Sequence, residues 1–291
     1  MRVRYTTLLA YLLPFMFILQ GCSGHHGVSS DQKPVVMVTV SPLEYFAKAI
    51  GGDAVEVVTL APGATDPETF EPTVAQMRDA SQADVILTVG LFPFEEKLLK
   101  SVKASNPSAV SATLADSVPV ILGTHGDDTE ADPHIWLSLR NARTMARTAA
   151  RTLSQSLPSH NTMFASRLAE LEQHIDSLDN VITSRLTPAK GASFIVGHPS
   201  LSYFAKDYGL HQIALEEEHK ESSVSSLRRN LEKAKEMRPL VYFTQQQFDI
   251  RSSHPVSEAT GLEPVSISPL SPHIEATILT AADAIAAAQA K

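Results

Sequence analysis

The stretch SHNTMFASRLAELEQHIDSLDNVITSRLT, residues 159–187, contains neither glycine nor proline and has an apolar residue at every third or fourth position. This spacing places the apolar side chains along one side of an α-helix. The stripe consists of Phe164, Leu168, Leu171, Ile175, Leu178, Ile182 and Leu186. At about 1.5 Å per residue, such a helix would be roughly 43 Å long, which is longer than one small lobe is wide. We therefore expect residues 159–187 to form a stiff linking helix between two lobes.

Short apolar runs alternate with helical patterns on both sides of this stretch. The strand-like runs are VVMVTV (35–40), AVEVVTL (54–60) and DVILTVG (84–90) before it, and ASFIVGH (192–198), HQIALE (211–216), LVYFTQ (240–245) and EPVSIS (263–268) after it. Strands that are apolar throughout and separated by helices indicate parallel sheets covered on both faces. We predict an α/β protein with an N-terminal lobe over 35–158 and a C-terminal lobe over 188–291. Each lobe would be a parallel sheet flanked by helices, with no sequence repeat between them.

The N-terminal segment has the pattern of an export signal. Residues 1–21 contain two arginines near the start and then an apolar run too short to cross a bilayer. They lead into LQGC, which resembles the lipobox of bacterial lipoproteins. We expect 1–21 to be a lipoprotein signal peptide, Cys22 to carry the lipid, and 22–34 to be a flexible tether. The alternative is an ordinary signal peptide followed by an unmodified Cys22.

The net charge and the cysteine content limit the ligands and the cross-links that this protein can have. The formal net charge is −8, so a nucleic-acid partner is not expected, whereas a cation is a suitable ligand. Cys22 is the only cysteine, so no intramolecular disulfide can form. From the export signal and lipobox we expect an exported, membrane-anchored protein that faces the periplasm or the cell exterior, and we expect it to be a monomer.

Imidazoles and carboxylates stand in the loops that follow the predicted strands or precede the linking helix. They are Glu68 in APGATDPETFEPT, His134 in ADPHIWLSL, His198 in GHPSL, and His273 and Glu275 in SISPLSPHIEA. Ligands of open α/β sheets bind beyond the carboxyl ends of the strands. We therefore expect these side chains to meet in a cleft between the lobes.

The chain also resembles a known family, the substrate-binding proteins of zinc and manganese ABC transporters. The resemblance covers Val35 to Ala290 and is carried, in order, by PGATDPETFEP, DPHIWLSL, the linking helix, GHPSLSYFAKDYGL, EEEHKESSVSSLRRN and ISPL. It implies two α/β lobes on a rigid helical backbone, a metal ion in the cleft as the transported ligand, and no enzymatic activity. It also implies a permease and its ATPase as partners.

The resemblance extends to the metal ligands, with two departures. His134 and His198 match the family's central histidines, but Glu68 stands where a histidine is usual, and SPHIE stands where an aspartate is usual. Glu68, His134, His198 and His273 together supply three nitrogens and one carboxylate, which suits tetrahedral Zn²⁺ better than Mn²⁺. We expect this set to be the zinc site.

The fourth ligand is the least constrained part of this set. His273 directly follows Pro272 at the end of the last predicted strand, whereas Glu275 lies in the first turn of the closing helix. A carboxylate there already stabilises the helix dipole, so we predict His273, with Glu275 as the alternative. Asp66 and Glu71 are expected to accept hydrogen bonds that hold the ligands in place.

Two other functions are compatible with the sequence. A secreted zinc-dependent hydrolase would need three protein ligands and a water molecule. The chain contains neither HExxH nor GxSxG, the motifs that would identify common hydrolases. A surface adhesin that uses the same fold is the second alternative, and the sequence does not distinguish it from a transport protein.

Overall fold

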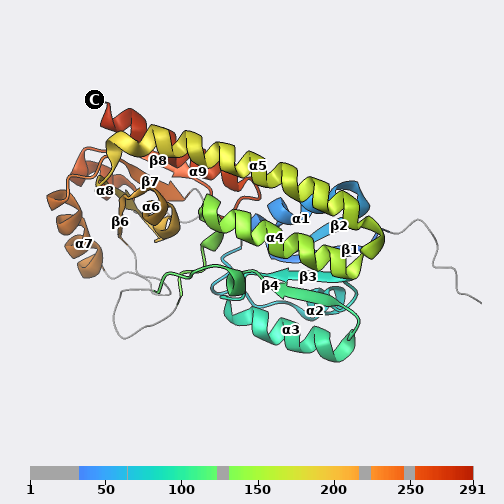
Figure 1. Cartoon of the computed structure of the whole chain (residues 1–291). Coiled ribbons are helices and arrows are strands. Elements are labelled where there is room, and N and C mark those ends of the chain that lie inside the picture. Colours follow the sequence, from blue (N-terminus) through green and yellow to red (C-terminus); the bar gives the residue numbers. More distant parts are fainter. Residues whose placement is uncertain (1–32, 64, 123–130, 216–223, 246–252, 291) are drawn as a thin grey trace, which may run out of the picture. The chain divides into compact units, whose positions relative to one another are not determined.

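The computed structural model of the 291-residue chain describes residues 33–63, 65–122, 131–215, 224–245 and 253–290 (Figure 1). The predicted signal peptide, Cys22 and nearly all of the tether lie outside these residues. Residues from Lys33 onward form one compact unit. Within the described ranges, we find no helix with both the length and the apolar character needed to cross a membrane.

The N-terminal lobe contains a four-stranded parallel sheet in the order β2-β1-β3-β4. Its strands are β1 (Val35–Val40), β2 (Glu56–Ala61), β3 (Val85–Thr88) and β4 (Val110–Thr113). The central strands β1 and β3 are almost fully buried, as expected for sequences that are apolar apart from one threonine each. The chain runs from β1 outward to β2 and then crosses to β3 on the other side, so loops diverge at the carboxyl ends of the central strands.

The C-terminal lobe repeats this topology with the strand order β6-β5-β7-β8, again all parallel. Its strands are β5 (Ser193–Val196), β6 (His211–Ala214), β7 (Tyr242–Gln245) and β8 (Pro264–Ile267). The seven strands predicted from the sequence are therefore present, with ends that differ by no more than three residues. The prediction of two parallel sheets flanked by helices is confirmed.

Helices cover both sheets and connect them. The α-helices are α1 (Glu44–Gly51), α2 (Val74–Ala80), α3 (Pro93–Ser105), α4 (Leu139–Ser156), α5 (Asn161–Leu186), α6 (Ser202–Tyr208), α7 (Val224–Glu236), α8 (Ser253–Thr260) and α9 (Ile274–Gln289). Single 3₁₀ turns are η1 (Ser41–Leu43), η2 (Gly52–Ala54), η3 (Ala115–Ser117), η4 (Ile135–Leu137), η5 (Pro158–His160) and η6 (Thr187–Ala189).

The predicted linking helix is confirmed as α5, extended by η5 and η6 at its two ends. It packs on α1 and α4 of the N-terminal lobe and on α9 of the C-terminal lobe (Figure 1). Five residues of the predicted stripe are buried, and Leu168 and Leu178 are partly buried against the same core. This core is continuous through both lobes, so α5 belongs to neither lobe alone.

Two elements were not predicted from the sequence. The edge strand β4 has the sequence VSAT, which is too small and polar to resemble a buried strand, yet its backbone pairs with β3. Helix α4 is rich in arginine and threonine, but one face of small residues is buried. Arg143 of α4 lies 3.1 Å from Asp176 and 3.4 Å from Glu172, both in α5, so ion pairs follow the contact between the two helices.

Side-chain hydrogen bonds also join the lobes. Trp136 Nε1 in η4 donates to the carbonyl oxygen of Pro269 at 2.8 Å. The Ser138 hydroxyl at the start of α4 donates to Asp207 of α6 at 2.5 Å. Burial raises the pKa of the Asp207 carboxyl, and the Ser138 hydroxyl and Arg140 oppose that shift. These two hydrogen bonds attach the segment around η4 to the C-terminal lobe.

Two neighbouring positions on α5 test the packing of this helix. Ile182 is fully buried, whereas Val181 is 46% exposed. We expect Ile182→Ala to lower the free energy of unfolding by about 2–5 kcal/mol, because it leaves a cavity in the shared core. Val181→Ala should change it by less than about 0.5 kcal/mol. Urea denaturation of both variants measures the difference, and equal midpoints would contradict the shared core.

Candidate metal centre

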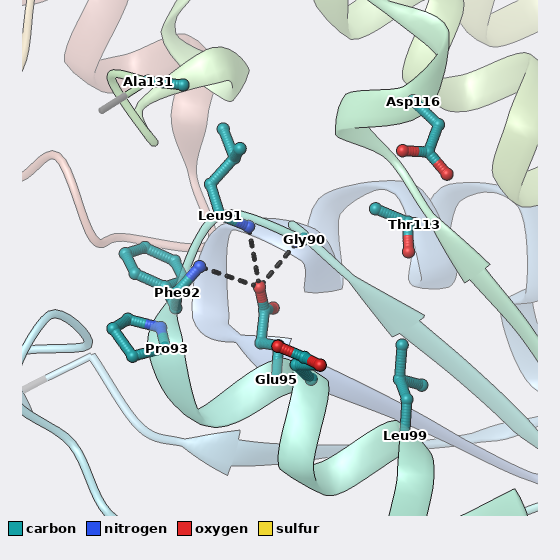
Figure 2. Close-up of a pocket in the computed structure, with 10 residues that line it drawn as sticks. Gly90, Leu91, Phe92, Pro93, Glu95, Leu99, Thr113, Asp116 and Ala131 are labelled. Atoms are coloured by element: carbon teal, nitrogen blue, oxygen red, sulfur yellow. Dashed lines mark hydrogen bonds between the residues drawn. The ribbon is translucent and has the colours of Figure 1, made fainter. Parts of the chain in front are cut away.

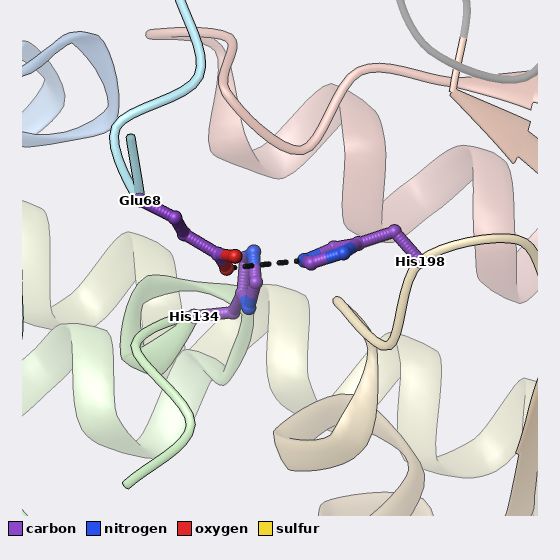
Figure 3. Close-up of side chains that lie close together, drawn as sticks. All are labelled: Glu68, His134 and His198. Carbon is purple, nitrogen blue, oxygen red and sulfur yellow. Dashed lines mark ion pairs between the residues drawn. The ribbon is translucent and has the colours of Figure 1, made fainter. Parts of the chain in front are cut away.

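Three of the predicted ligands, Glu68, His134 and His198, lie together in the structure (Figure 3). One ligand atom of each lies within 4.8 Å of the other two. Glu68 Oε1 is 3.4 Å from His198 Nε2, and the centroids of the two imidazole rings are 5.1 Å apart. Glu68 and His134 come from the N-terminal lobe and His198 from the C-terminal lobe. The group can hold a divalent cation between two nitrogens and one carboxylate.

Glu68 lies in the loop between β2 and α2. The Asp66 carboxylate accepts the backbone N–H of Glu68 at 3.0 Å and so shapes the turn that presents this side chain. At the end of the loop, Thr73 and Gln76 form a capping box at the start of α2. Gln76 Nε2 also donates to the carbonyl oxygen of Leu60 in β2 at 2.9 Å. The loop is thus held both within its turn and at its end.

His134 immediately precedes η4 and is buried, with 4% of the residue exposed. Asp132 Oδ1 accepts the backbone N–H of His134 at 2.8 Å and lies 2.9 Å from Nδ1 of its ring. Because an ionised carboxylate only accepts hydrogen bonds, Nδ1 carries the proton and Nε2 is left with a lone pair. This is the arrangement in which a histidine binds a metal through Nε2.

Asp132 also adds negative charge beside the group. The residue is 2% exposed, and its second oxygen, Oδ2, has no hydrogen-bond partner among the described residues. A buried carboxylate is costly unless a positive charge or donors compensate it. A cation between His134, His198 and Glu68 would supply that compensation.

His198 follows β5 in a loop that the neighbouring strands hold in place. The backbone N–H of Ser200 donates to the carbonyl oxygen of His198 at 2.8 Å. Gln245 of β7 donates from Nε2 to the Ser200 hydroxyl at 3.1 Å, and Gln212 Oε1 of β6 accepts the backbone N–H of Leu201 at 2.7 Å. The position of His198 is therefore set by both strands that flank β5.

The other two candidates lie at the start of α9. His273 occupies the N-cap position, its side chain is exposed, and it lies outside the group of three. Glu275, in the first turn, accepts a hydrogen bond from the Tyr45 hydroxyl of α1 and lies 2.9 Å from His174 Nε2 of α5. Its carboxylate therefore connects three helices.

Glu71 and Asp132 have roles that were not predicted from the sequence. The side chain of Glu71 is 83% exposed, and its carboxylate lies 3.8 Å from Lys97 Nζ of α3, which makes it a surface ion pair. No role in the site was predicted for Asp132, which the structure shows bonded to the imidazole of His134. An aspartate two residues before a candidate metal ligand is the sequence signal that could have identified this contact.

A separate hollow of about 510 Å³ opens at the carboxyl ends of β3 and β4 (Figure 2). At its base the buried carboxylate of Glu95 accepts the backbone N–H groups of Val89, Gly90, Leu91 and Phe92 at 2.6–3.2 Å. Burial raises the pKa of this carboxyl, and its hydrogen bonds oppose the shift. The lining includes none of the three clustered residues, and Glu95 serves there to hold the turn into α3.

A family profile described as "Zinc-uptake complex component A periplasmic" matches residues 36–286. A crystal structure of ZnuA is 32% identical, covers 89% of this chain and 100% of its own, and superposes with a TM-score of 0.80.

Two curated relatives are named for other metals. The manganese ABC transporter substrate-binding lipoprotein PsaA of Streptococcus pneumoniae is 27% identical over 88% of this chain and 86% of its own. The iron ABC transporter substrate-binding lipoprotein MtsA of Streptococcus pyogenes is 27% identical over 87% of this chain and 84% of its own.

Asp132→Asn tests the contact that orients His134. An asparagine can turn its amide N–H₂ toward Nδ1 and so favour the wrong tautomer, with the proton on Nε2. We expect the affinity for Zn²⁺ to fall by about 10- to 100-fold. The matched control is Asp79→Asn, which removes one negative charge from an exposed ion pair with Arg78 in α2. Equal affinities of the two variants in zinc titrations would contradict the role of Asp132.

Proposed function

This chain belongs to the zinc-uptake complex component A family of periplasmic metal-binding proteins, and we propose that it captures Zn²⁺ outside the cytoplasm for import by an ABC transporter. Members of this family are substrate-binding transport proteins rather than enzymes. Because relatives are named for manganese and for iron, the part of the proposal that goes beyond family membership is that the metal is zinc.

One observation carries the proposal: the convergence of Glu68, His134 and His198 within 4.8 Å. Two imidazole nitrogens favour Zn²⁺ over Mn²⁺, which prefers oxygen ligands. The orientation of His134 by Asp132 supports the same reading, because metal-binding histidines are commonly held by a carboxylate at the other ring nitrogen. The contribution of ligands from both lobes suits a protein that must take up and release its ion.

For the fourth ligand we retain His273 as the proposal. Glu275 is already bonded to Tyr45 and lies beside His174, so using it as a ligand would break these contacts. His273 is exposed at the end of the loop that follows β8. Ligation by His273 would require its imidazole to turn toward the group of three when the metal binds.

The remaining parts of the proposal concern delivery. The partners would be a permease and its ATPase, as expected for a substrate-binding component of an ABC transporter. The LQGC motif supports export and anchoring through a lipid on Cys22, so the protein would face the periplasm or the cell exterior. We propose that it acts as a monomer. Loss of growth in chelated medium on gene deletion, restored by added zinc, would support transport rather than adhesion.

His198→Ala tests the site directly. We expect elemental analysis to find zinc in the purified wild-type protein, which should bind Zn²⁺ more tightly than Mn²⁺. His198→Ala should weaken zinc binding by at least about 100-fold, because it removes a ligand. The matched control is His211→Ala, at an exposed histidine at the start of β6. Tighter binding of Mn²⁺ than Zn²⁺ would refute the choice of metal, and unchanged zinc binding by His198→Ala would refute the site.

A second pair of variants tests the fourth ligand. We expect His273→Ala to weaken zinc binding by about tenfold or more, because a ligand is lost, and Glu275→Ala to leave it within about threefold of wild type. Isothermal titration of each variant with Zn²⁺ measures both. The opposite order would assign the position to Glu275, and unchanged binding by both variants would exclude each residue as a ligand.

A further inference from the structure

Tyr203 reaches from the C-terminal lobe into the N-terminal lobe next to the candidate metal centre. It lies in the first turn of α6, five residues after His198, and is 3% exposed. Its hydroxyl accepts the backbone N–H of Ile121 at 3.0 Å and donates to the carbonyl oxygen of Asp132 at 2.8 Å. Both partners belong to the segment that carries His134.

The Tyr203 hydroxyl takes part in the backbone pairing of Ile121 with Asp132. Leu122 and Ala131 form an antiparallel bridge, and the next pair outward is Ile121 and Asp132. The N–H of Asp132 donates directly to the carbonyl oxygen of Ile121 at 2.8 Å. In a regular hydrogen-bonded pair the N–H of Ile121 would return a bond to Asp132. Here that second bond runs through the Tyr203 hydroxyl, which is inserted between the two groups.

The inserted hydroxyl acts on the residue that orients His134. It holds the main chain of Asp132, whose side chain accepts from both the backbone N–H and Nδ1 of His134. Helix α6 begins directly after the loop that carries His198. The Tyr203 hydroxyl therefore makes two hydrogen bonds that connect the segment before His134 to α6, the helix that follows the loop of His198.

We propose that Tyr203 is a positioning residue for metal binding, whose hydroxyl holds the Asp132–His134 segment against the His198 side of the site. This inference rests on the proposed function. A tyrosine hydroxyl can both donate and accept, as this position requires, whereas phenylalanine can do neither. In Tyr203→Phe the N–H of Ile121 can bond directly to the Asp132 carbonyl oxygen, which completes the pair within the N-terminal lobe and leaves the lobes less tightly connected.

Tyr203→Phe should weaken zinc binding by about three- to tenfold, the change in an equilibrium constant that corresponds to one ordinary hydrogen bond. We expect most of this loss as faster zinc release, measured by transfer to an excess of a chromophoric chelator. The matched control is Tyr208→Phe in the same helix, where a buried hydroxyl donates to Asp179 of α5 at 2.7 Å. This control should bind zinc within about twofold of wild type.

A double variant separates positioning from a general loss of stability. If Tyr203 acts through Asp132, then Tyr203→Phe should change zinc affinity by less than about twofold in an Asp132→Asn background. Its urea midpoint should also be no lower than that of Tyr208→Phe. Equal effects of Tyr203→Phe in the two backgrounds, or wild-type affinity of the single variant, would overturn the proposal.

Two further outcomes remain interpretable. Failure of the wild-type protein to bind zinc would refute the proposed function itself, whereas wild-type binding with an unaffected Tyr203→Phe would refute only this inference. If Tyr203→Phe does not fold, amide hydrogen exchange in the wild-type protein replaces it. We expect the Ile121 amide to exchange more slowly when zinc is bound, and unchanged exchange would count against the proposal.

Discussion

The unbroken helix α5 is the constraint on which the rest of the structure depends. Its apolar stripe packs on α1 of one lobe and α9 of the other, and α4 runs beside it with ion pairs along the contact. A continuous helical ladder bends little without proline, glycine pairs or an inserted group. Because helices of both lobes pack against this one element, the two lobes are held together and the loops at their strand ends come together in a defined place.

The site occupies the region where polar contacts between the lobes are concentrated. Trp136, Ser138 and Asp132 stand within seven residues of one another, and each is hydrogen-bonded to the C-terminal lobe. A single bond of this kind contributes about 0.5–1.5 kcal/mol. Three such bonds hold the short segment that carries His134 against the C-terminal lobe.

The negative charge around Glu68, His134 and His198 also favours a divalent cation. Glu68 and Asp132 bring two carboxylates into a largely buried space, and the histidines can be neutral when they bind a metal. A divalent cation would balance both carboxylates. Asp132 would contribute its charge without binding the ion itself, because its carboxylate is hydrogen-bonded to Nδ1 of His134.

The sequence by itself determined the fold class, the seven apolar strands, the linking helix and three residues of the candidate site. These features follow from periodicity and from the rule that ligands lie beyond strand ends, and both are local properties of the chain. The sequence missed β4 and α4, because VSAT is weakly apolar and the arginines of α4 hide a face of small buried residues.

Only the tertiary structure decided how the side chains of the site are partnered. Glu275 bonds to α1 and lies beside α5, Glu71 pairs with Lys97 at the surface, and the Tyr203 hydroxyl enters a backbone pair of the opposite lobe. Each partner is distant in sequence, apart from Lys97, and no local pattern encodes such contacts. They form because α5 and the shared core hold the two lobes together, which brings loops that are far apart in the sequence within hydrogen-bonding distance.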